Sequence, residues 1–405
     1  MKKGVLCFAV LAILLIALVV VSAQTPRSGN PSYKIGVDNA LTGGISVYAL
    51  DFQKGIEFAV EEINAKGGIN GRRIELVVRD DESDPVHTAN NVRALAQAGC
   101  LAMVGGAGFG LQNAVAPVVE EVKLPCVILA PIDPPYVEPG GYCFGGIWYT
   151  TEKIALARVR TCAEYGLRKM ALLISKEQAG EAQGKAWKKA AAPEEGVELV
   201  GIEWMLLTDT DVTPQLIKLR ATKPDAIGNI SGGKAAVVQY KSLLRLGWKI
   251  PMITIDSNTT PSFIEAMGED ADIVLAWAPT TAFRPDSIPA TDPTRAEVIS
   301  FAKRYEAKTG KVFGSMVTQG YDAMRSLFPV LEKTRPDPAK EELQAMRDRI
   351  RNELENQCFQ GLDWKICRTP KDHKGAQDPK AYKSIAKVEG KQFVPVTKAD
   401  LAKYR

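Results

Sequence analysis

The chain has 405 residues, more than the ~250–300 residues over which one hydrophobic core usually extends, so two lobes are expected. Charged residues make up 24% of the sequence and the formal net charge is only +4, without a dense basic run, which argues against nucleic-acid binding. The only two histidines are His87 and His373, and no C-x-x-C pair is present, so we expect neither a metal site nor a cofactor.

The N-terminal 23 residues have the order of a secretory signal peptide. Lys2 and Lys3 precede an almost unbroken apolar run, and small residues up to Ala23 supply a cleavage site before Gln24. A membrane anchor is the alternative, because the run is close to spanning length. The small-residue site and the lack of a basic flank favour cleavage. No later segment has ~20 consecutive apolar residues, so we expect a soluble protein secreted to the periplasm.

Short apolar runs then alternate with segments of helical period. The first set of predicted strands covers residues 33–37, 74–78, 101–104 and 126–129, and the predicted helices between them cover 51–65, 86–98 and 111–121. Strands that alternate with helices of this length indicate parallel β-α-β units, hence an α/β sheet covered on both faces.

The pattern restarts after Trp148. The second set has predicted strands at residues 170–174, 197–204, 226–228 and 252–255, and predicted helices at 154–165, 182–191, 214–221 and 235–246. Two sets of comparable units predict two similar lobes.

Proline-rich stretches, further helices and a polar tail make up the remainder. Helices are predicted at residues 295–309, 318–331 and 339–355, and a late strand at 392–394. Cys358 and Cys367 lie close in sequence and could close a hairpin, since export permits disulfides. Two buried thiols are the alternative.

Motifs of common enzymes are absent from the sequence, including the nucleophile elbow, the phosphate-binding loop and the zinc-protease motif. The turn from Gly105 to Gly110 lacks dinucleotide spacing and follows the third predicted strand rather than the first. It opens a helix at Leu111, where free backbone N–H groups could bind a carboxylate. Alternatively, the glycines only permit a tight turn.

Residues 33–85 resemble the start of the branched-chain amino acid-binding proteins, which are type I periplasmic binding proteins of ABC transporters. The segment Asn64-Ala65-Lys66-Gly67-Gly68-Ile69-Asn70-Gly71 is highly specific, and the segment 79–85 (RDDESDP) follows in order. The similarity continues to Gly320-Tyr321-Asp322-Ala323 and so covers nearly all of the predicted mature chain.

The resemblance implies two Rossmann-like lobes with parallel-rich sheets, joined by three crossings, with a ligand held between them and delivered to a membrane permease. We expect the crossings near residues 146–150, 277–281 and 357–361. Lobe 1 would comprise residues 31–148 plus 279–358, and lobe 2 residues 149–278 plus 359–405.

Site residues follow from the same resemblance. Tyr48 stands where the family often has an aromatic lining residue, although it could equally pack in the core. The family's hydroxyl-rich, carboxylate-binding turn is replaced in this chain by one without a hydroxyl, and the family's alanine/threonine turn after the next strand is replaced by one that carries an acid. The residues concerned are Gly108, Phe109 and Gly110 in the first turn and Ile132 and Asp133 in the second.

In the second lobe, Ala179 replaces a family aromatic residue, and Ser231 and Gly232 end a strand that faces the same crevice. Asp256 falls where some members bind the ligand ammonium. A carboxylate at a strand end in the crevice is partly desolvated, and a ligand cation would compensate it. A helix cap or turn residue is the alternative for Asp256. Trp148 and Tyr149 could cover the ligand or wedge the hinge.

We therefore expect a monomeric, non-enzymatic solute-binding protein for a small amino acid, an amine or an aromatic acid, with an ABC-transporter permease as its partner. Two rival hypotheses remain. A ligand-sensing receptor domain uses the same fold but would continue into a membrane span or signalling domain. A secreted α/β enzyme would need a nucleophile–base pair or a metal cluster.

Overall fold

The computed structural model describes residues 30–131, 137, 139–146, 150–192, 195–363, 365–375 and 384–404. Residues 31–405 form one compact unit, separate from residues 1–30. The predicted signal peptide, residues 1–23, lies outside the described residues. Within the described ranges, no helix is both long enough and apolar enough to cross a membrane.

The first sheet has five parallel strands in the order β2-β1-β3-β4-β5. β1 and β3 are almost wholly buried, as expected for strands covered on both faces. The bounds are β1 Tyr33–Asn39, β2 Ile74–Asp80, β3 Ala102–Gly105, β4 Cys126–Ile128 and β5 Cys143–Gly145.

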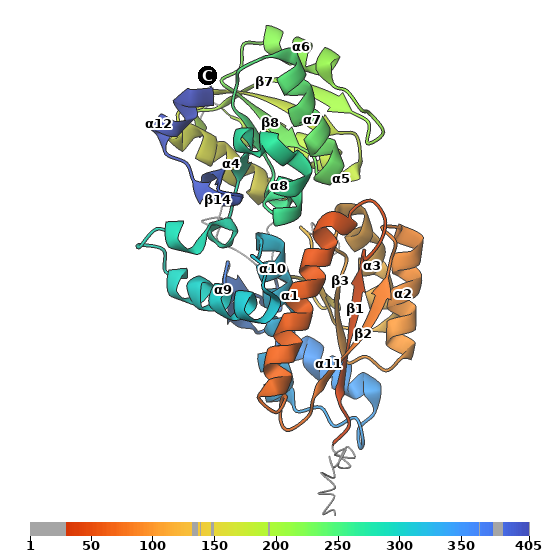
Figure 1. Cartoon of the computed structure of the whole chain (residues 1–405). Coiled ribbons are helices and arrows are strands. Elements are labelled where there is room, and N and C mark those ends of the chain that lie inside the picture. The colour runs from red at the N-terminus through yellow and green to blue at the C-terminus, as the bar shows by residue number, and fades with distance from the viewer. Residues whose placement is uncertain are drawn as a thin grey trace, which may run out of the picture. The chain divides into compact units, whose positions relative to one another are not determined.

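Helices from two distant parts of the chain cover this sheet. The early ones are α1 Ser46–Ala65, α2 Pro85–Gln97 and α3 Phe109–Val122, and the late ones are α9 Arg295–Thr309, α10 Ser315–Thr334 and α11 Leu343–Leu354. Figure 1 shows α1 and α10 side by side. Their backbones approach so closely that a Cβ atom at Gly55 would lie 1.9 Å from the carbonyl oxygen of Val317. A Cβ atom at Gly320 would lie 2.1 Å from the carbonyl oxygen of Phe52.

The second sheet has seven strands in the order β14-β13-β10-β9-β8-β6-β7. The five strands from β10 to β7 are parallel, whereas β13 pairs antiparallel with β10 and β14. The strand bounds are β6 Lys169–Ser175, β7 Glu198–Met205, β8 Ala226–Ile230, β9 Met252–Thr254, β10 Leu275–Trp277, β13 Ile385–Glu389 and β14 Gln392–Pro395.

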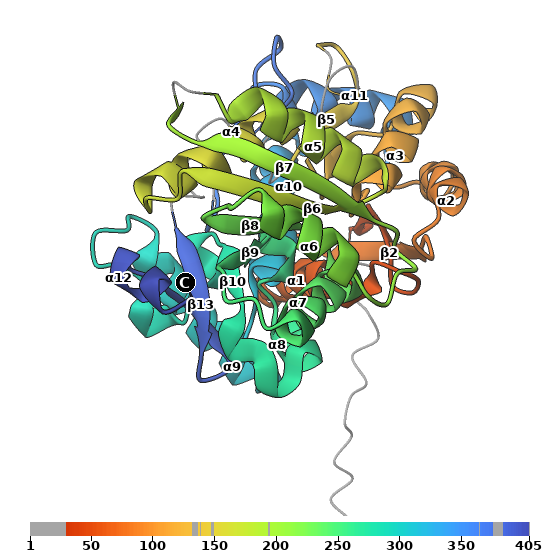
Figure 2. The same ribbon diagram turned by 90° about the horizontal axis from the view of Figure 1, so that it is seen from above.

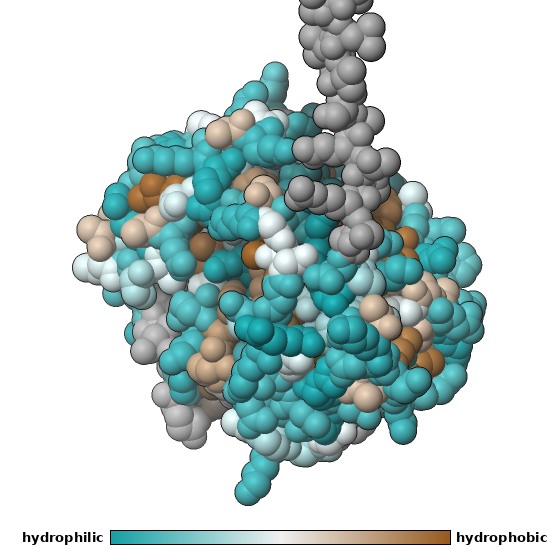
Figure 3. Space-filling model, turned by 90° about the horizontal axis from the view of Figure 1, so that it is seen from below, coloured by the Kyte–Doolittle hydropathy of each residue, from teal (hydrophilic) through white to brown (hydrophobic). Residues whose placement is uncertain are grey.

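Figure 2 shows β6, β7 and β8 with α5 on one side and α6 and α7 on the other. The helices of this part are α4 Thr151–Glu164, α5 Gln178–Ala190, α6 Thr213–Ala221, α7 Gly233–Leu246, α8 Pro261–Met267 and α12 Lys398–Leu401. Two parallel-rich sheets, each covered by helices, confirm the predicted two-lobed α/β fold. The face of the molecule in Figure 3 is mainly hydrophilic, with apolar residues in small groups.

A small hairpin follows α11, formed by β11 Cys358–Gln360 and β12 Lys365–Cys367. A disulfide joins Cys358 to Cys367 across it, as predicted. The other four cysteines among the described residues are free and buried.

The segment after this hairpin stays with the first sheet. Arg368 Nε donates to the Gly145 carbonyl at 3.0 Å, and the His373 ring stacks on Phe144 with centroids 4.4 Å apart. The chain joins the second sheet only at β13. The predicted third crossing near residues 357–361 and the lobe limits remain a prediction.

Candidate functional site

A cavity of about 420 Å³ lies where the carboxyl ends of strands from both sheets meet. Its walls are the segments that follow β1, β3 and β4 of the first sheet and β6, β7, β8 and β9 of the second. Ligands of open parallel sheets bind in this position, because the loops beyond the strand ends form a crevice there. The cavity is thus the candidate ligand site.

Seven of the ten predicted site residues line this cavity: Tyr48, Gly108, Gly110, Ala179, Ser231, Gly232 and Asp256. Phe109 lies in the first turn of α3, but its side chain is not among those described. Ile132 and Asp133 lie outside the described residues, as do Trp148 and Tyr149.

Among the helices that begin at the cavity, α3, α5 and α7 start without a side-chain cap. The N-cap residues are Gly108 for α3, Glu177 for α5 and Gly232 for α7. The first turn of a helix presents backbone N–H groups and a partial positive charge. The absence of side-chain caps leaves these three starts suited to a polar or anionic part of a ligand.

The glycine at position 108 is explained by close packing. A Cβ atom there would lie 3.0 Å from Ile45 Cδ1 and 3.6 Å from the Tyr48 hydroxyl. The tight turn itself is at Gly106, whose φ of +71° favours glycine, and the same turn opens α3 towards the cavity, so both sequence alternatives stand.

Asp256 is paired within the protein. Arg158 Nη2, from α4, donates to Asp256 Oδ1 at 2.9 Å, and the two side chains are 2% and 1% exposed. Arg158 also donates to Gln183 Oε1 at 3.3 Å and lies 5.5 Å from the centroid of the Trp277 ring. A buried carboxylate needs a compensating charge, and Arg158 supplies it, so burial alone gives no reason for a ligand ammonium at Asp256.

Asp256 does not cap α8 either. Its side chain stands at the start of the 3₁₀ helix η2, Asp256–Asn258. Thr260 is the N-cap residue of α8 and accepts from the Phe263 N–H at 3.2 Å. The cap alternative from sequence is therefore wrong, because α8 begins at Pro261, five residues later, whereas the turn alternative agrees with the position of Asp256 in η2.

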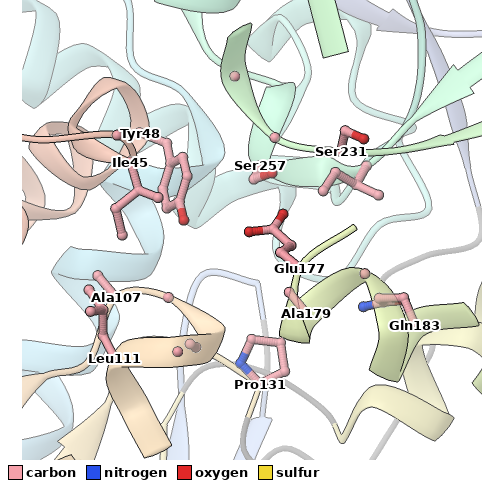
Figure 4. A pocket seen from close by; sticks show the side chains of 18 of the residues that line it. Ile45, Tyr48, Ala107, Leu111, Pro131, Glu177, Ala179, Gln183, Ser231 and Ser257 are labelled. Carbon is pink, nitrogen blue, oxygen red and sulfur yellow. The ribbon is translucent and has the colours of Figure 1, made fainter. Parts of the chain in front are cut away.

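Glu177 was missed as a site residue, although it directly precedes α5. The side chain is exposed, and Ser175 Oγ donates to its Oε1 at 2.7 Å. Figure 4 shows its carboxylate in the cavity, facing the Tyr48 hydroxyl and Ser257. Burial raises the pKa of Tyr48, and the charge of Glu177 raises it further, so the phenol stays protonated.

The serine in the second lobe has a fixed orientation. Gln239 Nε2 donates to Ser231 Oγ at 2.7 Å, and Asn258 Nδ2 donates to the Ser231 carbonyl at 2.8 Å. Ser231 is 2% exposed. Its hydroxyl proton can still be donated, because the contact from Gln239 uses the oxygen as acceptor.

The rest of the cavity surface is mainly apolar and was also missed from sequence. The additional apolar lining residues are Ile45, Val47, Phe52, Leu111, Leu129, Ile154, Leu207, Ile230, Ile255 and Met316. Among the described lining residues there is neither a histidine nor a cysteine. His373 is buried elsewhere, with Nε2 2.9 Å from Glu355 Oε1. The chemistry at the site is that of binding: apolar contact, hydrogen bonding and charge pairing.

Comparison with known proteins agrees with this geometry. The family model described as "Periplasmic binding protein" matches residues 32–389. A Leu/Ile/Val-binding protein homolog of Brucella abortus is 31% identical over 106 residues, which cover 26% of this chain and 29% of that relative. The Leu/Ile/Val-binding protein of Escherichia coli is 23% identical over 313 residues, 76% of this chain and 81% of the relative.

The fold has close counterparts among solved structures. An extracellular ligand-binding receptor from Rhodopseudomonas palustris superposes with a TM-score of 0.78 at 21% identity, covering 91% of this chain and 100% of the other. The relatives and the fold are those of solute-binding proteins, which are not enzymes. With a family model that spans almost all described residues, the chain belongs to the periplasmic binding protein family.

Proposed function

We propose that this protein captures a small organic solute with an apolar body between its two lobes and delivers it to an ABC-type permease outside the cytoplasm. The observation that carries the proposal is the cavity of about 420 Å³, whose lining comes from the strand ends of both sheets. A ligand in contact with both walls stabilises their approach, because it binds the closed arrangement better than the open one.

The composition of the lining supports a small organic solute. Apolar side chains predominate, and a few polar groups are placed at the helix starts and on the second sheet's side. Such a combination is typical of pockets in which apolar contact supplies affinity and a few polar groups fix orientation. Amino acids, amines and aromatic acids all meet this description.

A thermal-shift screen with these three classes tests the proposal, because a ligand that binds only the folded state raises the melting temperature. The cavity-filling variant Gly232→Leu should abolish the shift. Position 232 has room for a Cβ, whose nearest neighbours would be Ser257 Oγ and Tyr48 Cε1, both at 3.9 Å. Ile217→Leu, at a 54% exposed position outside the cavity lining, is the control. A ligand that stabilises Gly232→Leu as much as the parent protein would contradict binding in this cavity.

Export and delivery need separate tests. Mass spectrometry of the native protein should find a mature start near Gln24. Cells that lack this protein should take up the identified ligand more slowly, and a plasmid-borne copy should restore uptake. Unchanged uptake without the protein would contradict the transport role.

A further inference from the structure

We propose that Glu177 receives a protonated amine of the ligand, so that the solute is an amine-bearing molecule with an apolar body. This inference rests on the proposed function, since it assigns the ligand class of the same cavity. It differs from the sequence prediction, which gave the ammonium to Asp256.

The position of Glu177 directs its carboxylate into the cavity. Glu177 is the N-cap residue of α5, yet its side chain accepts no hydrogen bond from the helix start. The hydroxyl of Ser175, at the end of β6, holds one carboxylate oxygen instead, at 2.7 Å. Figure 4 shows the carboxylate directed into the cavity rather than towards the first turn of α5.

No cation of the protein neutralises this carboxylate within the described part of the chain. None of the described lysine, arginine or histidine side chains forms an ion pair with Glu177. The one arginine that lines the cavity, Arg158, is paired with Asp256 at 2.9 Å. A cation that enters the cavity therefore meets one acid that is already compensated and one that is not.

The groups around Glu177 suit an ammonium group. An ammonium has three N–H donors, and a tyrosine or serine oxygen can accept a hydrogen bond alongside a carboxylate. Figure 4 shows the Glu177 carboxylate facing the Tyr48 hydroxyl and Ser257. The three side chains come from different elements, namely α1, the start of α5 and η2. Closure of the two lobes around the ligand would exclude water and strengthen the attraction between the ammonium group and the Glu177 carboxylate.

The apolar surroundings give the second half of the ligand class. Ile45 and Leu111 on the first sheet's side, and Ile154 on the other, line the same cavity. A carboxylate on the ligand is compatible with the start of α3 but is not required, because no charged side chain demands it. The class therefore includes both apolar amino acids and plain amines.

Two matched ligand series test the assignment. One is L-leucine, 3-methylbutylamine and 4-methylpentanoate, and the other is L-phenylalanine, 2-phenylethylamine and 3-phenylpropanoate. Within each series the apolar body is constant, while the amine or the carboxylate is removed. Titration calorimetry should show that the amine-bearing members bind and that the deaminated acid binds more weakly or not at all.

Substitutions of two glutamates at the start of α5 form the second part of the experiment. Glu177→Gln keeps the size of the side chain and should weaken amine-bearing ligands by roughly 30-fold or more, since loss of one partner of a desolvated charge pair has effects of this order. Glu181→Gln, also exposed and on the first turn of α5, is the matched control and should leave affinity unchanged.

Three results would overturn the assignment. They are an acid that binds as tightly as its amine-bearing counterpart, an amine affinity that is unchanged in Glu177→Gln, and no binding by any amine-bearing probe. In each case the proposed function is judged separately, by whether another compound of the broader screen stabilises the protein and fails to stabilise Gly232→Leu.

Discussion

The two walls of the cavity differ in what they offer a ligand. The first sheet's wall is built from apolar or uncharged residues among those described, including Ile45, Tyr48 and Leu111. The second sheet's wall carries the charged side chains of the lining, which are Arg158, Glu177 and Asp256. One wall therefore supplies shape and exclusion of water, and the other supplies charge.

The charges of the second wall are themselves of two kinds. Arg158 and Asp256 are almost fully buried and paired with each other, so they belong to the core of that lobe. Glu177 is exposed to the cavity and has no cationic partner among the described residues. The difference teaches that an acid in a binding cavity is a ligand acceptor only when the protein has not already neutralised it.

The largest effect is expected where the buried pair is broken. Arg158→Leu should reduce the free energy of unfolding by about 3–5 kcal/mol, because it removes one partner of a buried ion pair. Denaturant unfolding measures the loss. Lys189→Leu, in the exposed pair with Glu152 (71% and 63% exposed), is the control and should have little effect. Equal stability of Arg158→Leu and the parent protein would show that the pair is not structural.

A substitution in the first sheet's wall should lower the affinity for ligands of different charge to the same extent. Ile45→Ala removes apolar contact and should weaken leucine and 3-methylbutylamine alike, by about tenfold, or ~1.4 kcal/mol. Calorimetry with both ligands provides the comparison, and Ile217→Ala is the exposed control. An effect on only one of the two ligands would mean that the first wall also discriminates charge.

A buried carboxyl outside the cavity, Asp363, should make the stability depend on pH. Asp363 accepts hydrogen bonds from Thr281, just after β10 of the second sheet, and from Thr318 of α10 at 3.2 Å. Burial, followed by the charge of Asp322 and opposed by these hydrogen bonds, raises the pKa of Asp363 to about 8, and burial raises the pKa of Asp322 to about 7. A carboxyl whose pKa is higher in the folded state stabilises the fold fully below its unfolded pKa of ~4, and the stabilisation is lost as pH rises through the folded value.

The free energy of unfolding should accordingly fall between about pH 4 and pH 8, by at most ~1.4 kcal/mol per pH unit for each proton that the folded state retains and the unfolded state has lost, and the melting temperature should fall with it. Asp363→Asn, which cannot ionise, should flatten the decline in that window. The same slope in Asp363→Asn as in the parent protein would assign the pH dependence to other groups.

The smallest effect on affinity is expected from loss of the Tyr48 hydroxyl. Tyr48→Phe should weaken amine-bearing ligands by about two- to tenfold, in line with one hydrogen bond of ~0.5–1.5 kcal/mol. It should leave any weak binding of 4-methylpentanoate unchanged. A loss as large as that of Glu177→Gln would mean that Tyr48, rather than the carboxylate, is the main amine contact.

Much of the fold could be predicted from the sequence, because periodicity is local. The helix predicted at residues 295–309 has these bounds in the structure, and the predicted strands of the first sheet lie within a few residues of those observed. β5, β10 and β13 were missed. β5 and β10 have only three residues each, too few to display a period, and β13 lies in a polar tail where its neighbours β10 and β14 define it.

The site was only partly predictable, because its chemistry depends on contacts between distant residues. The turns after β3 and β8 and the position of Asp256 were expected to face one crevice, and they line one cavity. Arg158 precedes Asp256 by 98 residues and lies on a helix, so no local pattern connects them. Glu177 could have been found by asking which acid lies between a mainly apolar strand and the helix that follows it, since β6 is almost wholly buried and Glu177 is the N-cap residue of α5.

The close crossing of α1 and α10 has a consequence for how the polypeptide is made. The glycines at positions 55 and 320 let the two backbones touch, yet 265 residues of chain separate them, including most of the second sheet. While a ribosome is still making the second sheet, the apolar face of α1 has no α10 to cover it. Contacts between such distant parts of a chain form late and leave aggregation-prone surface exposed until then. The nascent first lobe is thus expected to be a chaperone client until residue 334 has emerged.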